Sequence, residues 1–365
     1  MSSSQVDIPK KYKACVYDEP GKISTKVVEL DMPEPGPGEV LINLTHSGVC
    51  HSDFGIMTNS WAGLPHPTQP GQVGGHEGVG KVVKLGPGSD QFSSVKVGDR
   101  VGVKWVSSAC GSCPPCLEGM EGVCANQKIS GYYTPGTFQQ YVLGPANYVT
   151  PIPDGLESAD AAPMLCAGVT TYAALRKSGA ISGQWVVISG AGGGLGHIAV
   201  QLASRGMSFR VIGIDAGAKE QIIKDSGAEH FIDVTKHDDK SMAEEVNKLT
   251  GGLGASAVVV CTASNKAYAQ AMDLLRFGGT LVCVGMPEGK PEPIGKAFPA
   301  FMVAKQKNIT SVAVGNRREA IEALDFAARG VVKTHSTRVK MDKLTEVFEQ
   351  MKEGSLIGRV VLDLQ

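Results

Sequence analysis

Four cysteines in the segment CGSCPPCLEGMEGVC have the spacing of a metal site. Cys110, Cys113, Cys116 and Cys124 are separated by two, two and seven residues, so one loop can direct all four thiolates at one ion. Zn²⁺ favours four thiolates at about 2.3 Å, and short Cys-x-x-Cys steps are typical of closed zinc sites. An iron–sulfur cluster can use similar spacing. Cysteines of a core would not gather in a loop rich in Gly and Pro, so residues 110–124 are predicted to hold a structural zinc.

Three other residues of the metal-ligand type lie far apart in the chain. Cys50 lies in GVCHSD, His76 in GGHEG, and Cys166 in a helix-like segment. Two thiolates and one imidazole would leave one open position, which catalytic zinc requires. A free cysteine or a loop histidine is more often structural than a ligand, and spacing alone does not show that these segments meet.

A glycine-rich turn, GAGGGLG, follows the apolar run WVVIS. Its glycines, including Gly190, Gly193, Gly194 and Gly196, would let the backbone approach a pyrophosphate at the start of the next helix. The register is Gly-x-x-Gly-x-x-Gly rather than the simpler Gly-x-Gly-x-x-Gly. Because the turn follows a strand, opens a helix and precedes an acidic strand end, it predicts a dinucleotide site.

Asp215 ends the apolar run FRVIGID, 19 residues after Gly196. A carboxylate there can accept hydrogen bonds from the adenine ribose hydroxyls and would repel a 2′-phosphate, which favours NAD over NADP. The alternative is a solvated turn residue. Lys219 could reach the same ribose, and an exposed helix lysine is a comparable interpretation.

The segments that carry these residues differ in texture. Residues 1–160 contain short β-like runs between Gly/Pro turns, which indicates an irregular, mostly β domain. In residues 161–310, apolar strands alternate with amphipathic helices, which predicts a parallel sheet covered on both faces. Residues 311–365 contain two helix-like stretches and a closing strand. The segment 158–179 is predicted to be helical, with Ser158 or Asp160 as its cap.

Composition narrows the class of protein. A chain of 365 residues suggests two domains at roughly 150 residues each, and 42% apolar with 19% charged residues suits a soluble globular protein. A net charge of −1 without long basic runs argues against nucleic acid or an anionic membrane as partner. No apolar run approaches the ~20 residues of a membrane helix. The N-terminus lacks the apolar region of a signal peptide.

Cysteine usage favours a reducing compartment, and the cytosol is expected. The nine cysteines are an odd number, and four of them belong to the loop. Cys15, Cys261 and Cys283 lie in apolar, strand-like runs, where a free thiol behaves as a small hydrophobe.

Six motifs in this order resemble the zinc-containing medium-chain alcohol dehydrogenases, in particular the fungal, yeast-type branch: GVCHSD, GGHEGVG, CGSCPPC…C, LCAGVTTY, ISGAGGGLG and VGMP. The resemblance covers nearly the whole chain. It implies an α/β fold, in which a GroES-like, mostly β catalytic domain is formed by both ends of the chain. A Rossmann domain with a doubly wound parallel sheet is inserted between them. The implied activity is NAD-dependent interconversion of alcohols and aldehydes.

The resemblance also implies roles for individual residues. Cys50, His76 and Cys166 would be the catalytic zinc ligands, and Glu77 a transient one. Asp53 would orient the zinc-bound histidine, Ser52 would take the alcohol proton, and His51 would lie over the coenzyme pyrophosphate. The implied coenzyme contacts are the Gly193–Leu195 turn, Asp215, Lys219, Val284, Met286, Val314 and Arg359.

One residue of this chain departs from the family motifs, and two others predict the size of the substrate. Many relatives carry a histidine two positions after the aspartate of GVCHSD, which passes the proton to solvent; here that position is Gly55. His51 or water could replace it. Trp61 and Trp105 match two tryptophans that narrow the pocket, with Met286 nearby, which predicts small primary alcohols such as ethanol. They could instead be ordinary packing residues.

Two other functions are weighed against this one. A dehydrogenase of the same family could act on a larger, aromatic or polyol substrate. A non-catalytic, zinc-stabilised nucleotide-binding protein would be expected to lose Cys50, His76, Glu77 or Cys166, and all four are present. The yeast-type branch implies a homotetramer, with the sheet edge near residues 279–286 available for pairing.

Overall fold

The computed structural model describes residues 7–61 and 64–365. The chain forms two compact units. Unit 1 runs up to Cys166 and also contains residues 316–324 and 336–365, whereas unit 2 contains residues 167–315 and 325–335. Sequence placed the first boundary at residue 160 and assigned all of 311–365 to the catalytic domain. Instead, the chain crosses after Cys166, and residues 311–315 and 325–335 belong to unit 2.

Unit 1 is built on antiparallel strands. Within its described residues, the main sheet has the order β16-β17-β3-β4-β5-β9, with β8 also paired to β3. β1 and β2 form a separate antiparallel pair, as do β6 and β7. The strands are β1 (Lys11–Tyr17), β2 (Thr25–Asp31), β3 (Glu39–Val49), β4 (Gly78–Leu85), β5 (Arg100–Val103), β6 (Val106–Ser108), β7 (Lys128–Ile129), β8 (Tyr141–Pro145), β9 (Thr150–Pro151), β16 (Ser336–Lys340) and β17 (Arg359–Asp363).

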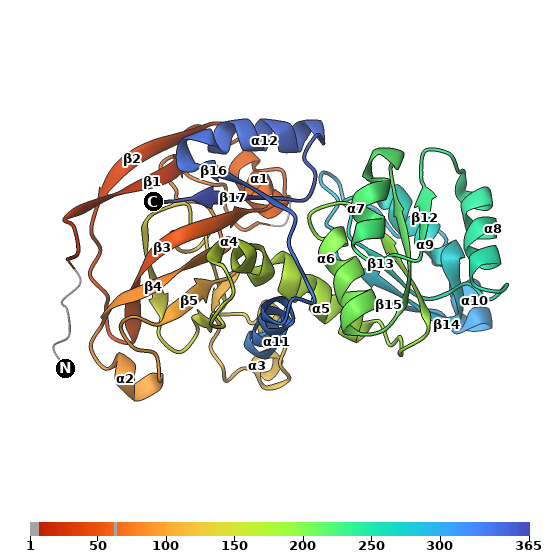
Figure 1. The fold of residues 1–365 in the computed structure, drawn as a ribbon, viewed down its shortest axis with the longest axis horizontal. Coiled ribbons are helices and arrows are strands. Elements are labelled where there is room, and N and C mark those ends of the chain that lie inside the picture. Colours follow the sequence, from red (N-terminus) through yellow and green to blue (C-terminus); the bar gives the residue numbers. More distant parts are fainter. Residues whose placement is uncertain (1–6, 62–63) are drawn as a thin grey trace. The chain divides into compact units, whose positions relative to one another are not determined.

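The sheet of unit 1 joins the two ends of the chain. β17 pairs with β3 antiparallel, so Val360 lies opposite Val49 (Figure 1). Val40, Ile42 and Leu44 of β3 are fully buried and belong to the same apolar core as Phe348. The predicted mostly β domain formed by both chain ends is therefore present, and its centre is β3.

Short helices accompany this sheet. α12 buries Leu344, Val347 and Phe348, whose spacing puts them on one helix face. α11 begins in unit 1 and ends in unit 2. The helices are α1 (His51–Thr58), α2 (Ser89–Phe92), α3 (Pro114–Leu117), α4 (Ser158–Ala161), α11 (Arg317–Ala328) and α12 (Leu344–Glu353).

The segment expected to be helical over 158–179 is interrupted. α4 is followed by a 3₁₀ turn, Ala162–Leu165, and α5 (Ala167–Lys177) begins one residue after Cys166. Pro163 has no N–H to continue an α-helical ladder, and Cys166 has φ −127° and ψ −68°, outside the helical range. The cysteine that sequence placed in a helix therefore lies at a break between two helices.

Unit 2 is a parallel sheet with helices on both sides. Its strand order is β12-β11-β10-β13-β14-β15. Along the chain, β10 to β12 are added toward one edge of the sheet and β13 to β15 toward the other, so the order of addition reverses between β10 and β13. This is the doubly wound order, in which ligands bind outside the carboxyl ends of the strands at the reversal. The strands are β10 (Trp185–Ser189), β11 (Arg210–Asp215), β12 (His230–Asp233), β13 (Ala255–Val260), β14 (Leu275–Cys283) and β15 (Asn308–Ser311).

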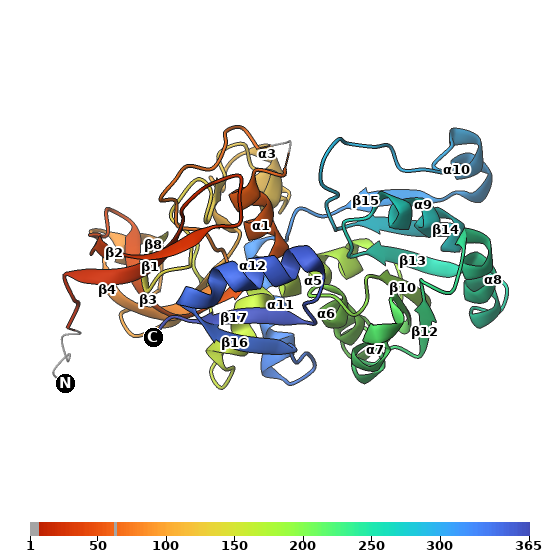
Figure 2. The same ribbon diagram turned by 90° about the horizontal axis from the view of Figure 1, so that it is seen from above.

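The central strands of unit 2 are covered on both faces. Every residue of β13 is buried, as expected for a strand between two helical layers. Figure 2 shows α6 and α7 on one side of the strands and α9 on the other. The helices are α6 (Gly196–Gln201), α7 (Glu220–Asp225), α8 (Asp239–Leu249), α9 (Asn265–Leu274) and α10 (Pro299–Lys305).

The free edge of this sheet differs from the expected one. Residues 279–286 were expected at the edge, but β14 lies between β13 and β15. β15, which sequence did not predict, covers β14 and forms the edge. In the described part of the chain, no helix is both long and apolar enough to cross a bilayer.

Candidate metal and coenzyme sites

The four loop cysteines converge as predicted. The Cys124 sulfur lies 3.7 Å from that of Cys113 and 3.6 Å from that of Cys110. A tetrahedron with bonds of about 2.3 Å has edges of about 3.8 Å, so these separations suit zinc. α3 starts directly after Cys113 with Pro114 at its first position, a residue that favours helix starts. That turn brings Cys116 into the same group.

Backbone N–H groups donate to the sulfurs of two of these cysteines. The Cys113 N–H donates to the Cys110 sulfur at 3.4 Å, and the Asn126 N–H donates to Cys124 at 3.4 Å. The N–H groups of Ser112 and Cys113 lower the pKa of Cys110 to about 5. Because thiolates are the form that binds metal, Cys110 is held in the ligand form, whereas burial and the neighbouring thiols raise the pKa of Cys116 to about 12.

A buried carboxylate anchors this loop within unit 1. Glu121, 7% exposed, accepts from the Tyr148 hydroxyl at 2.8 Å and from the Arg317 backbone N–H and Nε at 3.0 Å. The Asn316 side chain also donates to the Gly119 carbonyl at 3.0 Å. These bonds tie the loop to the first turn of α11.

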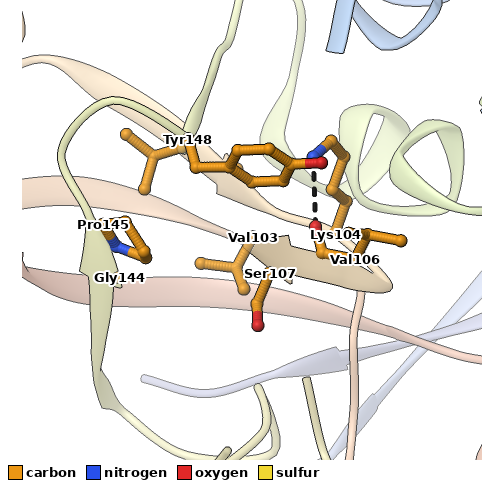
Figure 3. Close-up of a pocket in the computed structure, with 9 residues that line it drawn as sticks. Val103, Lys104, Val106, Ser107, Gly144, Pro145 and Tyr148 are labelled. Carbon is orange, nitrogen blue, oxygen red and sulfur yellow. Dashed lines mark hydrogen bonds between the residues drawn. The ribbon is translucent and has the colours of Figure 1, made fainter. Parts of the chain in front are cut away.

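A buried lysine lies beside that network. Lys104 is 2% exposed, donates to the Val106 carbonyl at 3.1 Å and lies 3.6 Å from the centre of the Tyr148 ring. Figure 3 shows it in a small cavity with Tyr148 and Ser107. Burial lowers the pKa of Lys104 to about 7, although Glu121 opposes the change.

The second candidate site assembles residues from three distant segments. Cys50, His76, Glu77 and Cys166 are all buried, and their ligand atoms lie within 4.8 Å of one another. Antiparallel pairing of β3 with β4 sets Ser47 opposite Gly78, so the end of one strand adjoins the start of the next. The helix break delivers Cys166, whose sulfur is 4.0 Å from that of Cys50.

Asp53 orients two of these groups. Its Oδ1 lies 2.7 Å from His76 Nδ1, and its Oδ2 accepts from the Cys50 backbone N–H at 3.0 Å. Among the described residues, His76 Nε2 is buried with no hydrogen-bond partner. Burial disfavours the charged imidazole, but Asp53 outweighs it and raises the pKa of His76. The arrangement leaves Nε2 as the atom for a metal, with the carboxylate behind it.

Glu77 lies between the cluster and Arg359. One carboxylate oxygen pairs with the Arg359 guanidinium, and the other, Oε2, is buried without a partner in the described chain. A Cβ on Gly48 would lie 1.9 Å from that oxygen, so only glycine leaves it room. Burial raises the pKa of Glu77 to about 7, against the effect of Arg359. Arg359, expected as a coenzyme contact, is 5% exposed and engages Glu77.

The donor set fits zinc in both clusters. Four sulfurs suit a closed structural site, whereas two sulfurs, one imidazole nitrogen and a carboxylate held partly by an arginine suit a site with one exchangeable position. Among the described residues, His76 Nε2 and Glu77 Oε2 are buried without a hydrogen-bond partner, which fits a cation bound between them because buried polar atoms are usually paired.

Two tryptophans lie beside the second cluster. The Trp105 ring centre is 4.8 Å from that of His76 and 5.9 Å from that of Trp61, both in edge-to-face contact. A Cβ on Gly55 would lie 2.8 Å from Trp61 Nε1, so the indole occupies the space that a larger side chain would need. In α1, the Ser52 hydroxyl is 3.7 Å from the Cys50 sulfur, and His51 is exposed.

The predicted coenzyme residues of unit 2 gather at the carboxyl ends of its strands. Gly190 has φ +77°, and a Cβ on Gly196 would lie 2.0 Å from the Gly190 carbonyl, so both positions require glycine. Asp215 accepts from the Gly192 N–H at 2.9 Å and lies 3.5 Å from Lys219 Nζ. The carboxylate is therefore held beside the glycine turn.

The remaining predicted contacts follow β14 and β15. The Val284 N–H donates to the Tyr268 hydroxyl at 3.2 Å, and Met286 is 57% exposed. Val314 has φ +59°, a left-handed conformation that costs a β-branched residue strain. Because all strands of this sheet are parallel, these residues lie at the same edge as the glycine turn.

Sequence reasoning missed the residues that support these sites. Glu121, Tyr148 and Arg317 come from three segments with no shared motif, so no pattern linked them. A lysine inside the apolar run RVGVKWV was the one available signal for Lys104. His197, directly after the glycine turn, was passed over as part of a helix.

Comparisons with known proteins agree with this geometry. Residues 36–154 match the family model of the alcohol dehydrogenase GroES-like domain, and residues 194–329 match that of the zinc-binding dehydrogenases. The chain is 66% identical over 363 residues to "Alcohol dehydrogenase 2" of Emericella nidulans, with 98% of this chain and 99% of the relative covered. It is 42% identical to "Alcohol dehydrogenase" of Schizosaccharomyces pombe over 98% of this chain and 99% of that one.

Solved structures give the same result. The alcohol dehydrogenase of the archaeon Aeropyrum pernix superposes with a TM-score of 0.84 at 27% identity, covering 96% of this chain and 99% of that one. The acetophenone reductase of Geotrichum candidum, solved in complex with NAD, superposes with a TM-score of 0.81 at 25% identity, covering 98% of each chain.

Two compact units with a closed and an open cysteine-containing cluster define a zinc-dependent dehydrogenase of two domains. The chain belongs to the zinc-containing medium-chain alcohol dehydrogenases, of the fungal type. The predicted GroES-like and Rossmann architecture and the predicted NAD- and zinc-dependent interconversion of alcohols and aldehydes are thereby confirmed.

Proposed function

We propose that this enzyme acts on small primary alcohols and their aldehydes, with ethanol-sized substrates preferred. The observation that supports the proposal is the series of ring contacts from His76 to Trp105 to Trp61, in which Trp105 lies next to a residue of the candidate zinc cluster and Trp61 next to Trp105. Indole rings are large and rigid, so a long or branched substrate would have to displace one of them.

The protein groups around the open position would divide the work. Zinc held by Cys50, His76 and Cys166 would supply a Lewis acid for the alcohol oxygen, and NAD would supply the hydride acceptor. Ser52, beside Cys50, would accept the alcohol proton. Asp53 would hold His76 in the tautomer that leaves Nε2 free for the metal. Glu77 would exchange between the metal and Arg359.

Proton release beyond Ser52 would not use a side chain at position 55. Gly55 has no proton-carrying group, and Trp61 occupies the space next to it. His51, exposed at the start of α1, or water would carry the proton to solvent.

Coenzyme binding would use the glycine turn of unit 2 and, by family resemblance, His51 and Arg359. The Gly193–Leu195 turn would hold the pyrophosphate with His51, and Asp215 with Lys219 would bind the adenine ribose. The Asp215 carboxylate, fixed by the Gly192 N–H, supports NAD over NADP because it would repel a 2′-phosphate. Val284, Met286 and Val314 would contact the nicotinamide half, and Arg359 would reach the pyrophosphate from Glu77.

The test is NAD⁺ reduction with primary alcohols of increasing length, measured together with zinc content. We expect two zinc ions per chain and the highest kcat/KM for ethanol. Trp61→Ala should raise kcat/KM for hexanol relative to ethanol about tenfold. Trp185→Ala, which removes an indole of unit 2 outside the pocket, should leave that ratio unchanged. A wild-type preference for aromatic alcohols or polyols would replace this proposal with a specialised dehydrogenase.

We infer a homo-oligomer, a tetramer by family resemblance, that assembles through the edge of the unit 2 sheet. Among the described strands, β15 pairs only with β14, and the exposed apolar side chains Phe298, Val303 and Ile309 lie on β15 and around α10. An exposed, apolar strand edge favours pairing with another copy. Sedimentation of wild type and Ile309→Lys tests this: the variant should dissociate, and an unchanged mass would count against the interface.

The cytosol is the proposed compartment. All nine cysteines are free thiols, and both clusters need reduced sulfur to bind metal. Localisation of a fluorescent fusion would test this assignment.

A further inference from the structure

His197, in the first turn of α6, joins the glycine turn to the segment 333–335. Its imidazole is fully buried. Nδ1 lies 2.8 Å from the Gly193 carbonyl oxygen, and Nε2 lies 3.2 Å from the His335 backbone nitrogen. Because a backbone N–H can only donate, Nε2 accepts, and the ring proton is on Nδ1, where it donates to Gly193. The two contacts therefore fix both the tautomer and the orientation of the ring.

The contact with Gly193 controls the direction of the next peptide N–H. The Gly193 carbonyl also accepts from the His197 backbone N–H at 3.2 Å, so it points toward α6. In a trans peptide, the carbonyl and the following N–H point in opposite directions. The Gly194 N–H therefore points away from the helix.

The N–H groups of this turn are available to a ligand. Within the described residues, neither Gly194 nor Leu195 has a backbone N–H bonded to a protein acceptor, whereas Gly190, Gly192 and Gly193 do. Free backbone N–H groups at this place in a doubly wound fold bind the pyrophosphate of a dinucleotide. A rotation of the Gly193–Gly194 peptide would turn one of these donors away.

We propose that His197 is a positioning residue for coenzyme binding. Its Nδ1–H holds the Gly193 carbonyl, and this hydrogen bond keeps the Gly194 N–H directed at the pyrophosphate. The bond to His335 orients the ring and does not itself bear on the coenzyme. The inference rests on NAD binding by unit 2, not on the identity of the alcohol.

Two substitutions separate the two nitrogens. In His197→Asn, the amide nitrogen occupies the place of Nδ1 and can still donate to Gly193, but nothing reaches His335. In His197→Gln, the amide reaches the place of Nε2, and the donor to Gly193 is lost. Gln201→Leu is the matched control, because Gln201 bonds the Lys333 backbone on the same helix face at 2.9 and 3.0 Å but does not touch the turn.

The measurement is calorimetric binding of ADP-ribose, which carries the pyrophosphate, and of 5′-AMP, which does not, with no alcohol present. We expect His197→Gln to weaken ADP-ribose binding about three- to tenfold while leaving 5′-AMP binding within about twofold. His197→Asn and Gln201→Leu should bind ADP-ribose like the wild type, even where thermal unfolding shows that they are less stable.

The outcomes are distinct. Equal ADP-ribose affinity of the Asn and Gln variants would overturn the proposal, and so would equal losses of ADP-ribose and 5′-AMP binding in the Gln variant. If the wild type bound no ADP-ribose, the assignment of unit 2 as the coenzyme site would fail with it. Failure to oxidise small alcohols with ADP-ribose binding intact would overturn only the proposed substrate.

Discussion

The two cysteine-containing clusters of this enzyme differ in how the chain builds them. Cys110, Cys113, Cys116 and Cys124 come from a single loop of fifteen residues, partly exposed at the surface of unit 1. Cys50, His76, Glu77 and Cys166 span more than one hundred residues and are fully enclosed. The first cluster depends on local spacing, whereas the second exists only when β3, β4 and the helix break have packed together.

The residues that surround the two clusters differ because one cluster suits a structural zinc and the other a catalytic zinc. Around the loop cysteines, backbone N–H groups donate to the sulfurs of Cys110 and Cys124, and the four sulfurs lie close enough to hold one ion. Around the enclosed cluster, Asp53 and Arg359 bond to His76 and Glu77, and His76 Nε2 and Glu77 Oε2 have no partner in the part of the chain that the structure describes. Four sulfurs that fill every coordination position suit a zinc ion that stabilises a loop. A group of metal-binding atoms without protein partners suits a zinc ion with one open position.

The largest expected effect comes from removing one zinc ligand of the enclosed cluster. Cys166→Ser should lower kcat by about a thousandfold or more, because a serine hydroxyl is a poor zinc ligand at neutral pH. Zinc content should fall from two ions per chain to one. Cys261→Ser, a change at a cysteine outside both clusters, is the control and should keep both values. Retention of kcat within about tenfold would break the distinction between the clusters.

Removing one zinc ligand of the loop cluster should lower stability more than it lowers kcat. Cys113→Ser should remove the structural zinc and lower the thermal midpoint by on the order of 10 °C, since metal binding contributes directly to folding. The kcat of the protein that remains folded should stay within about twofold. Ser112→Ala, in the same loop but not a ligand, should change neither quantity. Loss of kcat in proportion to zinc would mean that the loop takes part in catalysis.

The supporting carboxylates offer a finer comparison. Asp53→Asn should weaken zinc binding at the enclosed cluster about tenfold to a hundredfold, because the carboxylate orients His76. Glu121→Gln, at the loop, should lower the thermal midpoint and leave that affinity unchanged. Competition with a coloured chelator measures the zinc affinity of both variants, and thermal unfolding measures the midpoint. Equal affinities in the wild type and Asp53→Asn would contradict the orienting role.

The smallest effect concerns Lys104, beside the network that anchors the loop. Its pKa is about 7 in the folded protein, below the ordinary value of 10.5. Between these values the unfolded chain binds more protons, so stability rises with pH. Lys104→Met should remove on the order of 1–2 kcal/mol of this rise between about pH 7 and 10, measured by urea unfolding. Lys128→Met, an exposed change nearby, should preserve it.

Sequence predicted local features better than long-range ones. The loop cysteines, the glycine turn and the strands β10 to β14 of unit 2 follow from short patterns, and they appear where expected. The helix break at Cys166 was missed because the flanking residues are apolar and small, which suits a helix on either side. β15 was missed because NITS is short and polar, as an edge strand allows. The enclosed cluster was assigned through resemblance, since spacing carries no information on how β3 and β4 pair.

The buried ion pairs that hold the site residues in place were the features least predictable from sequence. Glu121 with Arg317, and Glu77 with Arg359, join residues separated by 196 and 282 positions. A charged residue in a sequence is usually exposed, and only the packed structure shows which ones are enclosed with a counter-charge. The same holds for Gly48 and Gly55, whose missing side chains make room for Glu77 and Trp61.

The pairing of β17 with β3 has a consequence for how the enzyme is synthesised. When residue 355 has been added, the growing chain already contains every candidate metal ligand and all of unit 2. It does not yet contain β17, which lies between β16 and β3, or Arg359, the counter-charge of Glu77. Unit 1 therefore completes its main sheet only when β17 joins β3, and until then Glu77 lacks its counter-charge.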